Sequence, residues 1–144
     1  MKRLYYIGFS VLLLNFLTSC CSAQAPQNIT SEDTSPGWTQ NGQKILLIGI
    51  VYQNDGKTPA PDVVIYYYQT NVEGKYLHKP EEKRSMPPNE LGQTHGYIRG
   101  WVKTDKDGKY SIYTVRPGTY PTKDEPAHVH LTIKEHNTKI GRAH

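Results

Sequence analysis

Short segments rich in β-branched and aromatic residues, separated by turns rich in Pro, Gly and Asp, recur along most of this chain. Such residues favour the pleated surface of a strand, and the turn residues mark where strands end. The segments that we predict as strands are residues 45–52, 63–68, 97–102, 109–115 and 127–133. The Asp107-Gly108 pair predicts a hairpin turn between two of them. With no convincing helix and no repeat, this pattern is typical of an all-β, antiparallel β-sandwich.

The segment at residues 63–68 indicates that a sheet is covered on both sides. Successive side chains of a strand point to opposite faces. Val63, Ile65 and Tyr67 share one face, and Val64, Tyr66 and Tyr68 share the other. Both faces are apolar or aromatic, which suits a sandwich.

Residues 1–19 have the features of an export signal. Lys2 and Arg3 provide a positive start, and residues 7–17 form an apolar run that is too short to span a bilayer comfortably. The run ends in Leu-Thr-Ser-Cys, which resembles the lipobox of bacterial lipoproteins, whose cysteine (here Cys20) becomes the lipidated first residue. This predicts a lipid-anchored protein of the cell envelope, with the outer membrane as the expected location. Ordinary secretion, with cleavage near the Ser-Ala-Gln-Ala that follows, is the alternative.

The composition after the signal divides the chain in two. Residues 20–43 are polar, contain Pro and Gly and show no periodicity, so we expect a flexible tether. Residues 44–144 are expected to form the folded domain. The sequence has two cysteines, Cys20 and Cys21. The domain therefore has neither a disulfide nor a thiolate site.

The net charge argues against a nucleic-acid-binding protein. The chain has 17 Lys and Arg residues against 13 Asp and Glu, and two of the basic residues belong to the expected signal. The remaining charge is small and evenly mixed, and the longest basic run, Lys83-Arg84, follows two glutamates. We therefore expect no nucleic-acid partner.

Residues 116–134 contain the side chains most relevant to chemistry. His128 and His130 are two positions apart on a predicted strand, so both imidazoles point to the same face. Tyr120 lies in the turn just before them. The three indicate a metal site that needs one more ligand, although a polar histidine stripe and a tyrosine that bonds backbone at a corner are the alternatives. The remaining histidines are interpreted as surface residues: His78, His95, His136 and His144.

Several motifs follow one another in a set order. They are Gly49-Ile50-Val51, Pro61-Asp62-Val63, Gly74-Lys75-Tyr76, Thr104-Asp105-x-x-Gly108-x-Tyr110, Arg116-Pro117-Gly118-Thr119-Tyr120-Pro121 and Pro126-Ala127-His128-Val129-His130. In this order they resemble the intradiol ring-cleavage dioxygenases, the family of catechol and protocatechuate dioxygenases. The resemblance covers about residues 45–134. The motifs identify this family as an ordered set, and no single one of them would.

The resemblance implies an antiparallel β-sandwich of the intradiol dioxygenase type with a non-haem Fe(III) site. Its activity would be cleavage of a catechol-like aromatic diol with O2, in aromatic compound catabolism. Tyr76 and Tyr120 match the two tyrosinate ligands, and His128 and His130 match the two histidine ligands. In the family, the tyrosine that corresponds to Tyr120 leaves the metal when substrate binds, which makes it catalytic. Phenolates are hard anionic donors that suit ferric iron, and the metal has to lower their pKa from about 10.

Two features depart from the family. Glu125 stands where the family usually has an arginine that stabilises negative charge on the substrate, and a carboxylate has the wrong sign for that role. Lys123 is the candidate catalytic residue that would supply the positive charge instead. The chain also has only 14 residues after His130, and residues 141–144 are not predicted as a strand. This would leave an unpaired sheet edge and would favour an oligomer in which a second subunit covers it.

Two other functions stay open on the sequence alone. Glu125 and the short C-terminal segment favour a non-enzymatic β-sandwich binding module on a lipoprotein, a degenerate dioxygenase. A zinc or copper site through His128 and His130 is the other. If Tyr76, one of 11 tyrosines, has only a packing role, a ligand of the iron site is lost and either alternative gains support.

Overall fold

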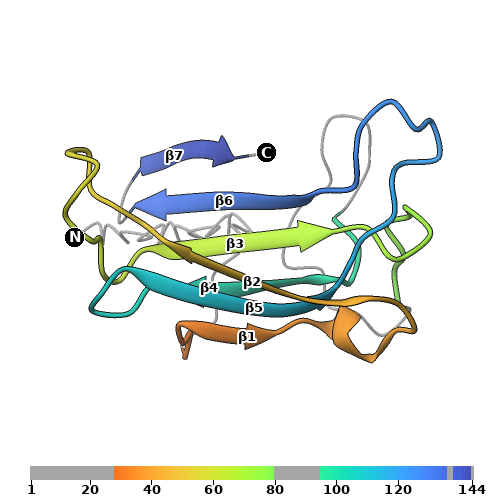
Figure 1. The fold of residues 1–144 in the computed structure, drawn as a ribbon, viewed down its shortest axis with the longest axis horizontal. Helices are drawn as coiled ribbons and strands as arrows, with labels where there is room; N and C mark the ends of the chain where they lie inside the picture. Colours follow the sequence, from red (N-terminus) through yellow and green to blue (C-terminus); the bar gives the residue numbers. More distant parts are fainter. Residues whose placement is uncertain (1–27, 80–94, 136–137, 144) are drawn as a thin grey trace, which may run out of the picture.

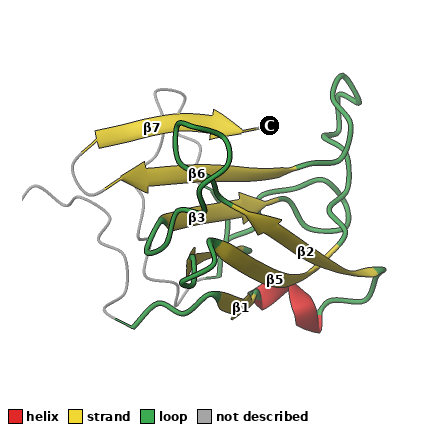
Figure 2. Cartoon of the chain, turned by 60° about the vertical axis from the view of Figure 1, so that its left-hand side comes forward, coloured by secondary structure: helices red, strands yellow, loops and turns green. Residues whose placement is uncertain are grey.

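A computed structural model of the chain describes residues 28–79, 95–135 and 138–143 (Figure 1). In chain order its elements are β1 (Glu32–Thr34), the 3-10 turn η1 (Pro36–Thr39), β2 (Lys44–Ile50), β3 (Val64–Gln69), β4 (Arg99–Lys103), β5 (Lys109–Val115), β6 (Val129–Glu135) and β7 (Thr138–Ala143). They form a three-stranded sheet of order β1-β5-β2 and a four-stranded sheet of order β4-β3-β6-β7. The β1–β5 pair is parallel and the other pairs are antiparallel. The predicted all-β sandwich is confirmed, and η1 is the one helical element in the described part of the chain (Figure 2).

The two sheets pack through a core to which both contribute. Ile65 and Tyr67 of β3, Val102 of β4 and Ile112 of β5 are fully buried. The Tyr67 hydroxyl donates to Asp33 Oδ2 of β1 at 2.6 Å, so a polar bond also joins the sheets. Partly buried apolar residues complete the core: Leu47, Val51, Val63, Tyr110, Val129, Leu131 and Ile133. Removal of this apolar surface from water is the main force that holds the layers together.

Strand β3 has the two faces that its sequence predicts. Ile65 and Tyr67 enter the core, and Tyr66 and Tyr68 project from the outer face of the four-stranded sheet. There the Tyr66 ring packs against Trp101 of β4, with ring centroids 4.5 Å apart. Both faces of β3 are therefore covered by aromatic or apolar groups.

The turn at Asp107-Gly108 does not form the predicted hairpin. Its reversal is local and tight, because Gly108 N donates to Asp105 O and Asp105 N donates to Lys109 O, both at 3.0 Å. However, β4 before the turn pairs with β3 in one sheet, and β5 after it pairs with β2 in the other. The turn residues set the reversal, whereas burial of the apolar faces decides which strands pair.

The folded structure begins before the expected boundary at Lys44. Strand β1 pairs with β5, and the next residue, Ser35, is buried. The Ser35 hydroxyl accepts from Gly37 N at 3.1 Å and lies 2.7 Å from Thr114 Oγ1 of β5. Residues 32–39 therefore belong to the sandwich rather than to a tether. Their polar composition is misleading because backbone pairing and a buried hydroxyl, rather than apolar side chains, fix them.

Residues 1–27, which include the expected signal and Cys20, lie outside the described residues. In the described ranges, no helix has the length and apolar character needed to cross a membrane.

The C-terminal segment forms strand β7, which pairs antiparallel with β6. The pairing includes Arg142 opposite Thr132 and Ala143 opposite Leu131. Two expectations are therefore wrong: that residues 141–144 form no strand, and that β6 is left as a bare edge. Backbone pairing covers β6 although its partner strand has no strong apolar pattern.

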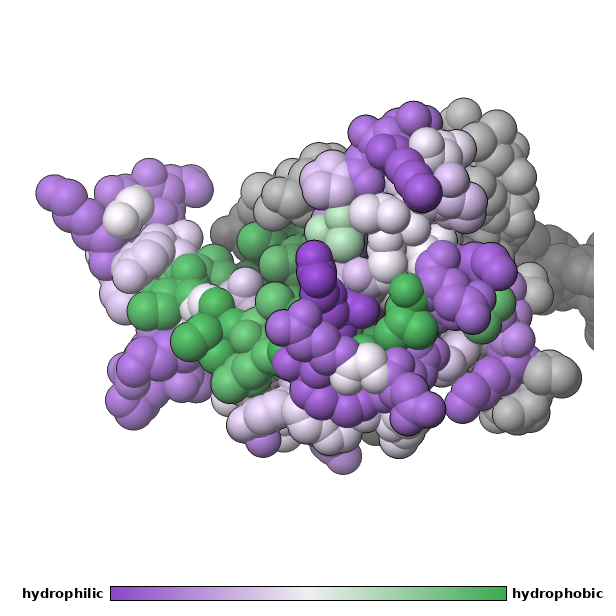
Figure 3. All heavy atoms as spheres, turned by 45° about the vertical axis from the view of Figure 1, so that its right-hand side comes forward, coloured by the Kyte–Doolittle hydropathy of each residue, from purple (hydrophilic) through white to green (hydrophobic). Residues whose placement is uncertain are grey.

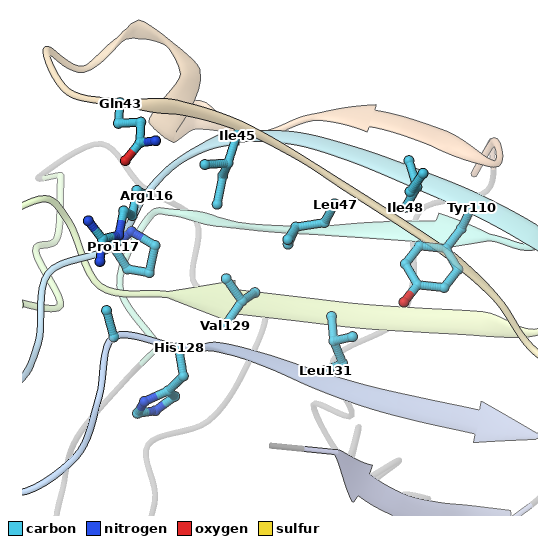
Figure 4. A pocket seen from close by; sticks show the side chains of 11 residues that line it. Gln43, Ile45, Leu47, Ile48, Tyr110, Arg116, Pro117, His128, Val129 and Leu131 are labelled. Carbon is cyan, nitrogen blue, oxygen red and sulfur yellow. The ribbon is translucent and has the colours of Figure 1, made fainter.

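An apolar groove runs between β2 and β6. Ile45 and Leu47 of β2 face Val129 and Leu131 of β6 across a hollow of about 660 Å³ (Figure 4). Ile48 of β2 also lines this hollow and is 73% exposed. Figure 3 shows a cluster of exposed apolar atoms on one face of the molecule, bordered by polar residues.

Candidate metal centre

The four predicted ligands come from one end of the sandwich. Tyr76 lies in the segment after β3, and Tyr120 lies in the segment before β6 (Figure 1). His128 directly precedes β6, and His130 lies within it. Because β3 and β6 pair antiparallel, the end of β3 adjoins the start of β6. The fold therefore brings distant parts of the sequence to one place.

A buried asparagine shapes the loop that contains Tyr76. Asn71 Oδ1 accepts the backbone N–H groups of Glu73 at 3.0 Å and Lys75 at 2.8 Å. The Asn71 carbonyl accepts from Gly118 N at 2.9 Å, in the loop that contains Tyr120. Asn71 thus holds the turn before Tyr76 and joins the two tyrosine loops. Beyond the general preference of Asn for turns, nothing in the sequence predicts this role.

The two tyrosine loops approach so closely that glycine is required at their contact. Gly74 has φ +80°, and a Cβ there would lie 1.7 Å from the Thr119 carbonyl oxygen. A Cβ on Gly118 would lie 2.5 Å from Gly74 N. Backbone therefore packs directly on backbone, and this contact sets Tyr76 beside Tyr120.

Four side-chain atoms converge at the centre. The Tyr76 and Tyr120 hydroxyl oxygens are 2.9 Å apart. Tyr120 Oη lies 3.3 Å from His128 Nε2 and 3.1 Å from His130 Nε2, and the two nitrogens are 3.0 Å apart. Two ligands of one metal, each about 2.1 Å from it and roughly 90–110° apart, are separated by about 3.0–3.4 Å. The structure thus brings together all four residues predicted as ligands, at separations that suit a shared ion.

The orientation of His128 is fixed by a backbone carbonyl. His128 Nδ1 lies 2.7 Å from the Pro126 oxygen, which can only accept, so Nδ1 donates and Nε2 presents its lone pair to the other donors. Figure 4 shows that His128 points away from Val129, which faces the groove. The alternation of β6 places His130 on the same side as His128. The donors therefore occupy the outer face of the sheet, where the His128 side chain is 18% exposed.

Burial also affects the protonation of Tyr76. It raises the pKa of Tyr76 well above the ordinary value, and the hydrogen bond with Tyr120 raises it further. The phenol keeps its proton unless a cation stabilises the phenolate. A highly charged ion among these donors would do so.

Tyr68 and His95 support the centre from the β3 side. Tyr68 is the cross-strand partner of His130, and their rings stack with centroids 4.4 Å apart. His95 stacks on Tyr68 at 3.7 Å, and its Nδ1 lies 3.0 Å from Tyr66 Oη. The interpretation of His95 as a surface residue is therefore wrong. The alternation of β3 could have identified Tyr68, whereas His95 follows no pattern in the sequence.

Lys123 and Glu125 lie differently relative to the four donors. Lys123 is exposed, has φ +58°, and donates its backbone N–H to the Tyr120 carbonyl at 2.8 Å. Among the described residues, no contact joins its ammonium group to any of the four donors. Glu125 Oε2 lies 3.8 Å from His128 Nε2. Among the described residues, the charged group beside the donors is therefore a carboxylate.

The donor set fits ferric iron. Ionised phenols are hard oxygen donors, and neutral imidazoles bind most first-row metals. The described part of the chain contains no group of three or more His, Cys, Asp or Glu side chains that could hold a metal ion. A metal at this place therefore depends on the two tyrosines, and phenolates favour a ferric ion over zinc or copper.

Comparison with known proteins agrees with this donor set. A family model described as "Dioxygenase" matches residues 18–141. The chain belongs to the intradiol ring-cleavage dioxygenase family. The chain is 31% identical over 98 residues to the protocatechuate 3,4-dioxygenase beta chain of Burkholderia cepacia, covering 64% of this chain and 39% of that protein. It is 26% identical over 127 residues to catechol 1,2-dioxygenase of Acinetobacter baylyi, covering 77% of this chain and 38% of that protein.

Solved structures show the same fold. An intradiol ring-cleavage dioxygenase from Tetranychus urticae matches with a TM-score of 0.60 at 17% identity, covering 83% of this chain and 60% of that chain. The 3-chlorocatechol 1,2-dioxygenase of Rhodococcus opacus 1CP matches with a TM-score of 0.57 at 23% identity, covering 78% and 47%. The alignments with the curated relatives span 39% and 38% of those proteins.

Proposed function

We propose that this chain binds Fe(III) through Tyr76, Tyr120, His128 and His130 and cleaves a catechol-like aromatic diol with O2. The observation that supports this most directly is that Tyr120 Oη lies 2.9–3.3 Å from the donor atoms of the other three residues, with the two histidine nitrogens 3.0 Å apart. The names of the curated relatives, a protocatechuate and a catechol dioxygenase, support the substrate class.

The chemistry divides between the metal and the chain. A diol would chelate a ferric ion held here through both of its oxygens, and the chemistry that the ion supplies is withdrawal of electron density, which makes the ring reactive toward O2. Tyr120 is the donor best placed to respond to the diol, because its oxygen contacts the other three donors. As a phenolate, Tyr120 would be the group that accepts a proton from one diol hydroxyl. His128 and His130 stay in place because the Pro126 carbonyl and a stacked ring hold their planes.

The test is addition of Fe(III) to the purified protein. We expect a visible phenolate-to-iron charge-transfer band, a shift of this band when catechol is added, and O2 uptake. Tyr120→Phe should abolish uptake. Tyr52→Phe is the matched control, because Tyr52 is 46% exposed and lies in the turn region after β2. A colourless protein that binds no iron would exclude the proposal.

A non-enzymatic binding module is the second candidate function. The Glu125 carboxylate beside the donors favours it, because a negative charge there opposes an anionic substrate. An iron-loaded protein that binds catechols but takes up no O2 with any of them would support this alternative. Uptake that depends on Tyr120 would exclude it.

We also propose that Cys20 anchors the protein to a membrane of the cell envelope. The lipobox resemblance of the preceding residues supports this. Cys20→Ser should release the protein into the soluble fraction, and Cys21→Ser, its neighbour, should leave it in the membrane fraction. Equal behaviour of the two variants would contradict lipidation at Cys20.

A further inference from the structure

Every second residue of β2 presents an apolar side chain to solvent. Leu46 is 49% exposed, Ile48 is 73% exposed and Ile50 is 43% exposed. Side chains of a strand alternate between its two faces, and Leu47 of the same strand packs against the core. The three exposed residues therefore form a row on the outer face of the three-stranded sheet, which we call the β2 row.

Aromatic side chains extend the β2 row across the sheet. Tyr113 of β5 is the cross-strand partner of Leu46. The Trp38 ring of η1 packs edge-on against the Tyr113 ring, with centroids 5.6 Å apart. Both aromatic residues are partly exposed. A continuous exposed apolar surface of this kind marks a place where a protein contacts a partner or a membrane.

Positive charges border this surface. Lys109 is exposed and is the cross-strand partner of Ile50. The ammonium group of Lys44 lies 5.5 Å from the centre of the Trp38 ring. The alternation of β1 places one carboxylate, Glu32, on this face, at the edge of the sheet farthest from β2. Tryptophan, tyrosine and lysine around an apolar centre are typical of surfaces that lie in the headgroup region of a bilayer.

The place where the chain enters the fold favours a membrane over a partner protein. Residues 28–31 lead into β1, which belongs to the same three-stranded sheet as β2. Residues 20–27 span at most about 30 Å, since an extended chain covers about 3.3–3.6 Å per residue. A lipid on Cys20 would therefore keep this sheet close to the bilayer. Docking would then be intramolecular, so even a surface of low affinity would be occupied.

We propose that the outer face of the three-stranded sheet docks on the lipid bilayer, with the β2 row among the headgroups and Lys109 beside anionic lipid phosphates. The inference rests on the proposed lipid anchor at Cys20 and goes beyond it, because it adds a second membrane contact and an orientation. A second copy of the same face is a poorer partner, since it would bring the lysines of the two faces together.

The proposed orientation has a consequence for the metal centre. The donor atoms lie on the outer face of the four-stranded sheet, and His128 points away from the groove between the sheets (Figure 4). The two outer faces of a sandwich point in opposite directions. Docking through the β2 row would therefore leave the donor atoms facing solution, where a dissolved diol can reach them.

The two tryptophans of the chain lie on different sheets, so each reports on its own face. Trp38 packs beside the β2 row, whereas Trp101 of β4 packs against Tyr66 of the other sheet. The lipidated protein is extracted from membranes and reconstituted into vesicles of phosphatidylcholine and phosphatidylglycerol, some of them brominated near the headgroup. Bromine quenches the fluorescence of a tryptophan that it contacts. Trp101→Phe leaves Trp38 as the sole reporter, and Trp38→Phe leaves Trp101.

We expect brominated lipid to quench Trp38 and to leave Trp101 unquenched. In the Trp101→Phe protein, the double substitution Ile48→Thr and Ile50→Thr should lower docking at least about tenfold, because two exposed apolar side chains lose their burial in lipid. Threonine suits a strand and both sites are exposed, so the fold is retained.

Two further variants separate apolar from charged contributions. Leu77→Thr is the matched apolar control, because Leu77 is 44% exposed but lies in the loop that contains Tyr76, and it should leave quenching unchanged. Lys109→Gln should reduce quenching in vesicles that contain phosphatidylglycerol and leave it unchanged in pure phosphatidylcholine, since the charge acts only on anionic lipid.

Four results would overturn the proposal. Equal quenching of the two tryptophans would show that no face is preferred, and an unquenched Trp38 would show that this face does not touch lipid. Quenching that survives both threonine substitutions would exclude the β2 row. A Trp38 signal that depends on protein density and not on bromine would assign the face to a second copy. In each of these cases the lipid anchor stands. If Cys20→Ser stays in the membrane fraction like the unaltered protein, the anchor itself fails, and the inference fails with it.

Discussion

The rings of Tyr68 and His130 stack almost in parallel, with centroids 4.4 Å apart and planes 11° apart. The two residues are cross-strand partners on the outer face of β3 and β6. On Tyr68, His95 forms a second stack at 3.7 Å and 4°, and at these separations two imidazoles cannot share one face of the phenol. Tyr68 is therefore held between them and fixes the plane of His130.

Loss of the Tyr68 ring should weaken the metal site. Tyr68→Leu removes the surface on which the His130 imidazole rests, and supporting groups of this kind are worth about 10–100-fold in metal affinity. The measurement is competitive titration with Fe(III). Tyr68→Phe keeps the ring and should stay much closer to the unaltered protein. If Tyr68→Leu and Tyr68→Phe bind iron equally well, the stack does not position His130.

Gly74→Ala should separate the two tyrosine loops. Its Cβ would lie 1.7 Å from the Thr119 carbonyl oxygen, and its φ of +80° disfavours any side chain. We expect iron binding to fall by more than about tenfold, since Tyr76 Oη moves away from Tyr120 Oη. Gly56→Ala is the matched control, because Gly56 has φ +67° with nothing within 4 Å of an added Cβ.

Gly56→Ala should therefore cost only the backbone strain, about 1–2 kcal/mol, and leave iron binding unchanged. Chemical denaturation gives the stability of each variant, and titration gives the iron affinity. Similar effects of the two alanines on iron binding would show that the loop contact at Gly74 does not shape the site.

The sequence predicts the orientation of side chains best in strands, where successive side chains point to opposite faces and one face is buried. The alternation in β3 places Tyr67 in the core and Tyr68 on the outer face, and the spacing of His128 and His130 puts both rings on one side of β6. These predictions succeed because strand geometry alone decides them.

The sequence predicts poorly where long-range contacts decide. The turn at Gly108 joins strands of different sheets, which its local pattern cannot reveal. Asn71 becomes important only because its carbonyl meets Gly118 from a loop far along the chain. Likewise, Ser35 belongs to the fold because Thr114 of β5 lies beside it. Each of these contacts is visible only in the tertiary structure, because the local propensity of a residue does not specify which distant residue it will contact.

The buried hydroxyl network around Thr114 should be important for stability. Thr114 Oγ1 donates to Gln69 Oε1 at 3.1 Å and lies 2.7 Å from Ser35 Oγ, which must then donate to it. Thr114→Val has a similar shape but leaves Gln69 Oε1 without this donor and the Ser35 hydroxyl proton without its acceptor in a buried place, at a cost of about 1–3 kcal/mol. Thr114→Ser keeps the hydroxyl and should cost less. Urea denaturation measures both, and a Thr114→Val variant as stable as Thr114→Ser would contradict the network.

Tyr67 should make the fold sensitive to alkaline pH. Burial, followed by the hydrogen bond to Asp33 and the charge of that carboxylate, raises the pKa of Tyr67 far above its ordinary 10.0. Above about pH 10 the unfolded chain loses this proton while the folded protein keeps it, so the free energy of unfolding falls as pH rises. The contribution of one such group is up to about 1.4 kcal/mol per pH unit. At neutral pH both states are protonated, and the group adds no pH dependence.

Tyr67→Phe tests this through the slope of stability against pH. The variant should be about 1–3 kcal/mol less stable at pH 8, because Asp33 loses a hydrogen-bond donor. Between pH 10 and 11, however, its stability should fall less steeply than that of the unaltered protein, by about 1 kcal/mol over that unit, since one titrating phenol has been removed. Tyr52→Phe, at an exposed tyrosine, should leave the slope unchanged. Parallel pH profiles for the Tyr67→Phe and unaltered proteins would show that the Tyr67 phenol does not keep its proton in the folded state.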